Sequence, residues 1–243
     1  MDNSIDLKKH VLSTYLTLRV GLAGAAIFLP FFLWWGGHYL FDVQLKKSMS
    51  AYYHEEGLLR DVFVGILMMV AAFLYLYKGF TQRENIALNL AGLFLAVVAL
   101  VPTAKPGIDV GQFTLHGASA LFFFLAIGYV ALFRANDTLP LMKDRVKAKR
   151  FAWIYRIVGA AMIASPLIAF VLVLLFGTTE QGGSSWVFFF EAVSVVVFGL
   201  YWIFKTLEVQ HTHAEQRALE GSLRVAPAQS SELFKAAQVE PAS

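Results

Sequence analysis

The chain has 243 residues and a net charge of +3, and 58% of its residues are hydrophobic while only 15% are charged. Soluble proteins contain roughly 45–50% apolar and about 25% charged residues, so this composition excludes an ordinary soluble domain and indicates an integral membrane protein. The absence of cysteine excludes disulfides, thiolate metal sites and cysteine nucleophiles. The small net charge gives no reason to expect a nucleic-acid partner.

Six apolar segments follow one another along the chain, and each approaches the length needed to cross a bilayer. A spanning helix needs about 20 mostly apolar residues, because the hydrocarbon core is about 30 Å thick and a helix rises about 1.5 Å per residue. The segments are residues 20–41, 62–77, 86–101, 113–133, 157–176 and 186–204. The sequence therefore predicts an all-α polytopic membrane protein with six transmembrane helices.

Lysine and arginine are distributed unevenly among the segments outside these helices. Sixteen of the 20 lie in the N-terminal segment, the second and fourth loops with their flanks, and the C-terminal tail. The first, third and fifth loops contain only Lys46, Lys47, Arg60 and Lys105. Because cytoplasmic loops carry the excess of positive charge, both termini are predicted to be cytoplasmic, and the first, third and fifth loops to face outward.

This topology predicts a simple domain organisation. Residues 1–19 would form a cytoplasmic N-terminal segment, residues 20–207 the six-helix transmembrane domain, and residues 208–243 a cytoplasmic tail. The tail is polar and ends in a stretch rich in Ala, Pro, Ser and Gln, so we expect most of it to be disordered.

Unusual polar residues concentrate at the predicted outer ends of the helices. Glu191 lies near the outer end of the sixth helix, and a carboxylate in hydrocarbon costs about 2.5–3.5 kcal/mol at mid-membrane. We therefore expect it to face the bundle and to contact a partner, with Arg60 or His116 favoured. The candidate residues of an outward-facing pocket are Ser48, Ser50, Tyr52, Tyr53, Arg60, Asp61, His116, Ser119, Glu191 and Ser194.

Each of these residues also has a purely structural interpretation. Glu191 would serve as well in an ion pair that fixes the sixth helix, and His116 in a packing hydrogen bond. Tyr52 and Tyr53 suit an aromatic belt at the membrane interface, and Asp61 complements the dipole at a helix N-terminus. The functional hypothesis depends on the coincidence of these groups on one side of the membrane.

The histidines on that side also suggest a metal site. His38, His54 and His116, with Asp61 or Glu191, would supply the nitrogen and oxygen ligands that suit zinc. No two of them have a recognised ligand spacing on one helix, so the alternatives of zinc and of no cofactor both stay open.

Several blocks of the sequence are similar to a known signature. Ser48-Met-Ser-Ala-Tyr-Tyr and then Arg60-Asp-Val-Phe-Val-Gly65 resemble a family of uncharacterised bacterial six-helix multi-pass membrane proteins. Phe190-Glu191 and Phe198-Gly-Leu-Tyr-Trp202 continue the resemblance, which covers most of residues 45–205. It implies six helices in the bacterial inner membrane and no particular activity. More distantly, the chain resembles the damage-regulated autophagy modulator family.

A second resemblance points to an enzyme. Ser50-x-x-x-His54, followed by Asp61, is similar to part of the pattern of the alkaline ceramidase and adiponectin receptor superfamily, which are seven-helix zinc-dependent lipid amidases. The chain departs from that pattern in having six predicted helices and no His-x-x-x-His in a late helix. The sequence thus favours a protein that binds a membrane lipid or small amphiphile in a binding, sensing or accessory role. The alternative is a metal-dependent hydrolase acting on a membrane lipid.

The topology can be tested with a reporter that is active only outside the cytoplasmic membrane. Fused after Ser243, such a reporter should be silent, because the distribution of lysine and arginine predicts a cytoplasmic C-terminus. The same reporter inserted in the first loop should be active, and the opposite pattern would reverse the predicted orientation.

Overall fold

A computed structural model describes residues 3–103, 114–176 and 185–223, and these residues form helices and no strand. Six helical stretches within them are long and apolar enough to cross a membrane, which confirms the predicted all-α class and the predicted number of spans. They are Asp6–Phe41, Leu58–Leu76, Gln82–Leu100, Leu115–Leu141, Arg145–Leu172 and Trp186–Thr212.

The first and fourth spans are composite. α1 (Asn3–Phe31) contains Pro30 and continues through one turn of π-helix, η1 (Phe32–Gly36), into α2 (Gly37–Phe41). A π-turn follows naturally here, because proline cannot donate the i→i−4 hydrogen bond and its ring displaces the carbonyl of the preceding turn. The fourth span joins three elements, α5 (Leu115–Tyr129), η3 (Val130–Arg134) and η4 (Ala135–Leu141).

The other spans are single helices. They are α3 (Leu58–Leu76), α4 (Gln82–Leu100), α6 (Arg145–Phe176) and α7 (Trp186–Thr212), and two short helices are η2 (Ser50–His54) and α8 (Ala214–Leu219). Side chains at two helix starts act as N-caps. Thr81 accepts a hydrogen bond from the Glu84 N–H before α4, and Asp144 accepts from Val146 and Lys147 at the start of α6.

Three helices extend eight or more residues beyond the apolar segments that predicted them. α1 begins at Asn3 instead of residue 20, α6 begins at Arg145 instead of residue 157, and α7 ends at Thr212 instead of residue 204. Hydropathy detects only the apolar part of a helix, whereas Lys, Arg and Glu are themselves good helix formers and extend it. Residues 224–243 of the predicted tail lie outside the described residues.

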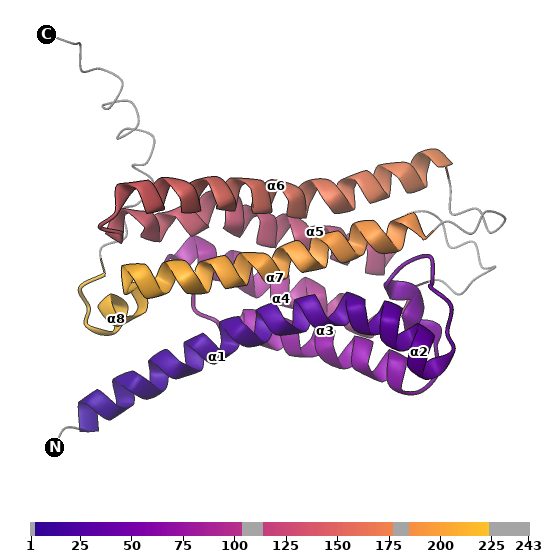
Figure 1. The fold of residues 1–243 in the computed structure, drawn as a ribbon, viewed down its shortest axis with the longest axis horizontal. Coiled ribbons are helices and arrows are strands. Elements are labelled where there is room, and N and C mark those ends of the chain that lie inside the picture. Colours follow the sequence, from indigo (N-terminus) through magenta and orange to yellow (C-terminus); the bar gives the residue numbers. More distant parts are fainter. Residues whose placement is uncertain (1–2, 104–113, 177–184, 224–243) are drawn as a thin grey trace, which may run out of the picture.

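The spans form a ring in which each packs against the next in the chain, from the first span through α3, α4, α5 and α6 to α7, and α7 packs back against α1. Figure 1 shows the start of α1 and α8 at one end, here called the terminal end. α2 and the start of α7 lie at the opposite end, here called the distal end. A ring of this kind leaves an interior that side chains from every span can reach.

Glycines permit two of the close contacts in the ring. A Cβ added to Gly199 of α7 would lie 3.1 Å from the Ala23 carbonyl oxygen of α1, and one added to Gly92 of α4 would lie 2.7 Å from the Ala71 carbonyl oxygen of α3. Backbone atoms cannot move aside as a flexible side chain can. Small residues at such contacts are how membrane helices approach closely enough for van der Waals packing.

Replacing Gly92 by Ala should therefore force α3 and α4 apart and destabilise the bundle by about 1–3 kcal/mol. The measurement is thermal unfolding of the purified protein in detergent. Gly65→Ala on α3 is the matched control, because a Cβ there meets nothing within 4 Å and alanine has the higher helix propensity. Equal midpoints for the two variants would contradict the close contact at Gly92.

Candidate functional site

A cavity of about 330 Å³ lies inside the distal half of the ring and has lining residues from all six spans. Its walls are mostly apolar, and Leu29, Phe63, Leu95, Phe123 and Phe198 represent five of the helices that form them. Its polar lining residues are Ser48, Ser50, Thr103, Thr114, His116 and Glu191. Apolar walls with a few polar groups are typical of small-molecule sites.

Glu191 lies in the second turn of α7 and is bonded to the backbone of the first loop. Its Oε2 atom accepts a hydrogen bond from the Met49 N–H, with an N–O distance of 2.6 Å. One turn earlier, the Phe188 N–H donates to the Lys47 carbonyl oxygen at 2.9 Å. These two bonds hold residues 47–50 against α7. The predicted partners of Glu191 are thus wrong, because a backbone amide takes the place of Arg60 or His116.

The two serines lie beside this attachment. The Oγ atoms of Ser48 and Ser50 are 3.0 Å apart, and Ser48 Oγ also accepts from the Ala51 N–H at 3.1 Å. These bonds start η2 as a side-chain cap would. The hydroxyls of the first loop are therefore fixed at the cavity by the same segment that carries the Glu191 contact.

His116 reaches the cavity from the first turn of α5, which Thr114 caps by accepting from the Gly117 N–H. The imidazole is buried, and its Nδ1 atom lies 2.7 Å from the Val101 carbonyl oxygen. Because a carbonyl can only accept, Nδ1 carries the hydrogen, and in the neutral tautomer Nε2 is then an acceptor. His116 thus presents either an acceptor or, when protonated, a second donor.

The structure brings four of the ten predicted pocket residues to the cavity: Ser48, Ser50, His116 and Glu191. The other six do not line it. Tyr52 is fully buried against Phe188, and burial raises the pKa of its hydroxyl. Arg60 and Asp61 form an exposed ion pair with each other.

The remaining three predicted residues also lie outside the cavity lining. Tyr53 is half-buried and its ring packs against the His54 ring. Ser119 is buried within α5, and Ser194 is buried with its hydroxyl donating to the Phe190 carbonyl oxygen at 2.9 Å. Ser194 therefore faces the interior as predicted, although its hydroxyl serves the helix backbone.

The predicted zinc ligands His38, His54, His116 and Asp61 do not form a metal site. Within residues 3–103, 114–176 and 185–223, no three His, Asp or Glu side chains come together in a way that could hold a metal ion. His54 is bonded instead to Thr103 at 3.0 Å, and His38 is exposed beside Tyr39. Each predicted ligand instead contacts a neighbouring group of its own.

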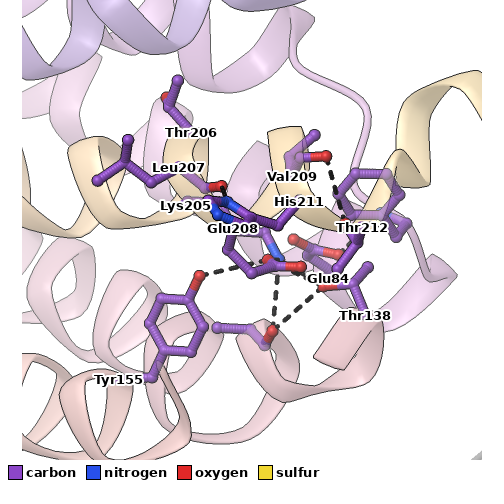
Figure 2. A network of polar contacts seen from close by, with 12 residues as sticks. Glu84, Thr138, Tyr155, Lys205, Thr206, Leu207, Glu208, Val209, His211 and Thr212 are labelled. Carbon is purple, nitrogen blue, oxygen red and sulfur yellow. Dashed lines mark hydrogen bonds and ion pairs between the residues drawn. The ribbon is translucent and has the colours of Figure 1, made fainter. Parts of the chain in front are cut away.

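Sequence reasoning missed a second polar assembly, which fills the ring at the terminal end (Figure 2). Lys205 Nζ lies 2.6 Å from Glu208 Oε2 and 2.8 Å from Thr138 Oγ1, and Tyr155 donates to the same Glu208 oxygen at 3.3 Å. All four side chains are buried. We call these residues the terminal cluster, and Figure 2 shows Glu84 beside them.

A second buried ion pair lies at the same end. Arg19 of α1 is only 2% exposed and pairs with Glu215 of α8, and its guanidinium also contacts the Tyr77 hydroxyl at 3.4 Å. The distribution of positive charge along the sequence assigns Arg19 to the N-terminal segment and Lys205 to the C-terminal tail. A signal was present in the i, i+3 spacing of Lys205 and Glu208, which places opposite charges on one helix face.

Comparisons of the chain with protein-family models, with curated proteins and with solved structures find no match. Function is therefore inferred from the cavity and the terminal cluster.

The terminal cluster predicts a large effect of removing one charge. Lys205→Met leaves the Glu208 carboxylate buried without its cation, which should lower the free energy of unfolding by about 3–5 kcal/mol. Lys205→Met combined with Glu208→Gln should recover part of this loss, as measured by thermal unfolding in detergent.

Lys46→Met is the matched control, because it breaks the Lys46–Glu55 ion pair, in which both side chains are partly exposed to solvent. Such pairs contribute about 0–1 kcal/mol. A double variant at positions 205 and 208 that is less stable than Lys205→Met would contradict the proposed charge compensation.

Proposed function

We propose that this protein binds a lipid or small amphiphile in the distal cavity, as a binding, sensing or accessory protein of the bacterial inner membrane. The supporting observation is the division of the cavity into an apolar body and a polar rim. Leu67, Val70, Phe124 and Phe198 lie deeper along their helices and belong to the body, whereas the polar lining residues of the described chain all lie in the distal loops or near the distal ends of their helices.

The depth of the cavity suits the chain of an amphiphile. Glu191 and Phe198 both line it and lie seven residues apart on α7, which corresponds to about 10 Å along the helix axis. The apolar chain of a ligand would extend past this length of α7 toward the middle of the ring. Its headgroup would then lie among Ser48, His116 and Glu191.

The two ends of the ring differ in a way that supports this assignment. The terminal end is filled by the buried side chains of Lys205, Glu208 and Tyr155, while the cavity occupies the distal half. If both termini are cytoplasmic, as the distribution of positive charge predicts, the polar rim faces the outer side. We favour binding over zinc-dependent hydrolysis, because the side chains predicted as zinc ligands do not come together among the described residues.

The proposal predicts saturable binding of an uncharged amphiphile that depends on cavity volume. Purified protein in phosphatidylcholine nanodiscs should bind tritiated dodecan-1-ol saturably in a scintillation proximity assay. Ala120→Phe should abolish most of this binding, because Ala120 lines the cavity and a phenyl ring there would fill it.

Ala118→Phe is the matched control, since two residues along a helix point to nearly opposite faces and Ala118 does not line the cavity. It should bind dodecan-1-ol as the unmodified protein does. Equal binding by both phenylalanine variants would place the amphiphile elsewhere and refute the proposed site.

A further inference from the structure

We propose that the distal cavity selects amphiphiles with a cationic headgroup, such as a long-chain primary ammonium, and that Glu191 is the residue that recognises it. The inference deepens the proposed function and rests on it. The class of ligand is inferred from the charged groups that line the cavity and from those that its described lining lacks.

The first observation concerns the partners of Glu191. The ion pairs among the described residues join Arg19 to Glu215, Lys46 to Glu55, Arg60 to Asp61, Arg134 to Asp137 and Lys205 to Glu208. Glu191 belongs to none of them, and its partners are the backbone amides of Met49 and Ser50. A carboxylate can accept about four hydrogen bonds, so acceptor capacity is left for a ligand.

The second observation concerns the rest of the lining. Among the described residues that line the cavity there is no Lys and no Arg. The remaining polar groups are hydroxyls and the imidazole of His116, whose Nε2 atom is an acceptor in the neutral form. Among these described residues, a phosphate, sulfonate or carboxylate headgroup would meet a carboxylate and no compensating cation. An ammonium headgroup would find acceptors.

The third observation is the environment of a second enclosed acid in the same chain. Glu208 in the terminal cluster is fully buried, whereas Glu191 is partly buried, and Lys205 supplies the positive charge beside Glu208 at 2.6 Å. Ionised carboxylates in apolar surroundings require such compensation. At Glu191 the described protein supplies amide dipoles alone, and a ligand cation would supply the missing charge.

The test is competition between three amphiphiles with the same twelve-carbon chain. Dodecylamine, dodecan-1-ol and dodecanesulfonate, unlabelled and below their micellar concentrations, would displace tritiated dodecan-1-ol from the protein in phosphatidylcholine nanodiscs at pH 7.5. We expect dodecylamine to reach half-displacement at a concentration roughly tenfold lower than dodecan-1-ol, because a charge-assisted hydrogen bond replaces a neutral one. Dodecanesulfonate should be the weakest competitor.

Glu191→Gln keeps the size of the side chain and an oxygen that can accept from the Met49 amide, but removes the charge. This variant is expected to bind tritiated dodecan-1-ol more weakly, because the headgroup lies beside position 191, and to lose the preference for dodecylamine. Asp61→Asn is the matched control, because it removes an acid that is exposed and outside the cavity lining. It should retain the roughly tenfold preference.

The results separate the two proposals. If tritiated dodecan-1-ol does not bind saturably, or if Ala120→Phe does not abolish most of that binding, the proposed function fails. The headgroup inference then fails with it. If that binding is present but dodecylamine has no advantage over dodecan-1-ol, or keeps its advantage in Glu191→Gln, only the headgroup inference is overturned. Stronger displacement by dodecanesulfonate than by dodecan-1-ol would also overturn it.

Discussion

An ionised side chain inside an apolar bundle must be compensated, and this constraint separates the two ends of the molecule. At the terminal end Lys205 meets Glu208, and Arg19 meets Glu215, so each cation has a buried or nearly buried acid beside it. At the distal end Glu191 has only backbone amides. The same electrostatic requirement is met by an internal cation at the terminal end, and under the proposed function a ligand cation would meet it at the distal end.

α7 connects these two environments. It carries Glu191 near its start and Lys205 and Glu208 fourteen or more residues later, which is about 21 Å along its axis. Its interior face also contains Phe198 and Trp202, whose rings are in contact at a centroid distance of 6.3 Å. Phe198, which lines the cavity, and Trp202, which follows it toward the terminal cluster, therefore lie on consecutive turns of a single helix.

Hydropathy was sufficient to predict the number of spans, because apolar segments of nearly 20 residues leave few alternatives in a bilayer. It misplaced the terminal-end boundaries of α1, α6 and α7, where charged residues continue the helix without adding hydrophobicity. The orientation of individual polar side chains was harder to predict. Ser48, His116 and Glu191 were grouped by their predicted side of the membrane, and all three line one cavity in the structure.

The contacts within the site could not be read from the sequence for a physical reason. A search for partners of Glu191 considers side chains such as Arg60 and His116, but the group that it binds is the Met49 amide, and every residue except proline carries an amide. Lys205 and Arg19 were missed because a cation beside an apolar segment usually marks a loop. For Arg19 only the fold shows that an acid is placed to receive it, whereas the i, i+3 spacing already puts Glu208 on the same helix face as Lys205.

If the cavity binds a cationic amphiphile as proposed, the hydrogen bond between Met49 and Glu191 would couple its occupancy to the order of the first loop. A cation beside the carboxylate stabilises its ionised form, and an ionised acceptor forms the stronger bond with the Met49 N–H. By thermodynamic reciprocity, a loop held more firmly must in turn raise the affinity for the cation by the same factor. Under that proposal, the order of residues 47–50 would report whether the cavity is filled.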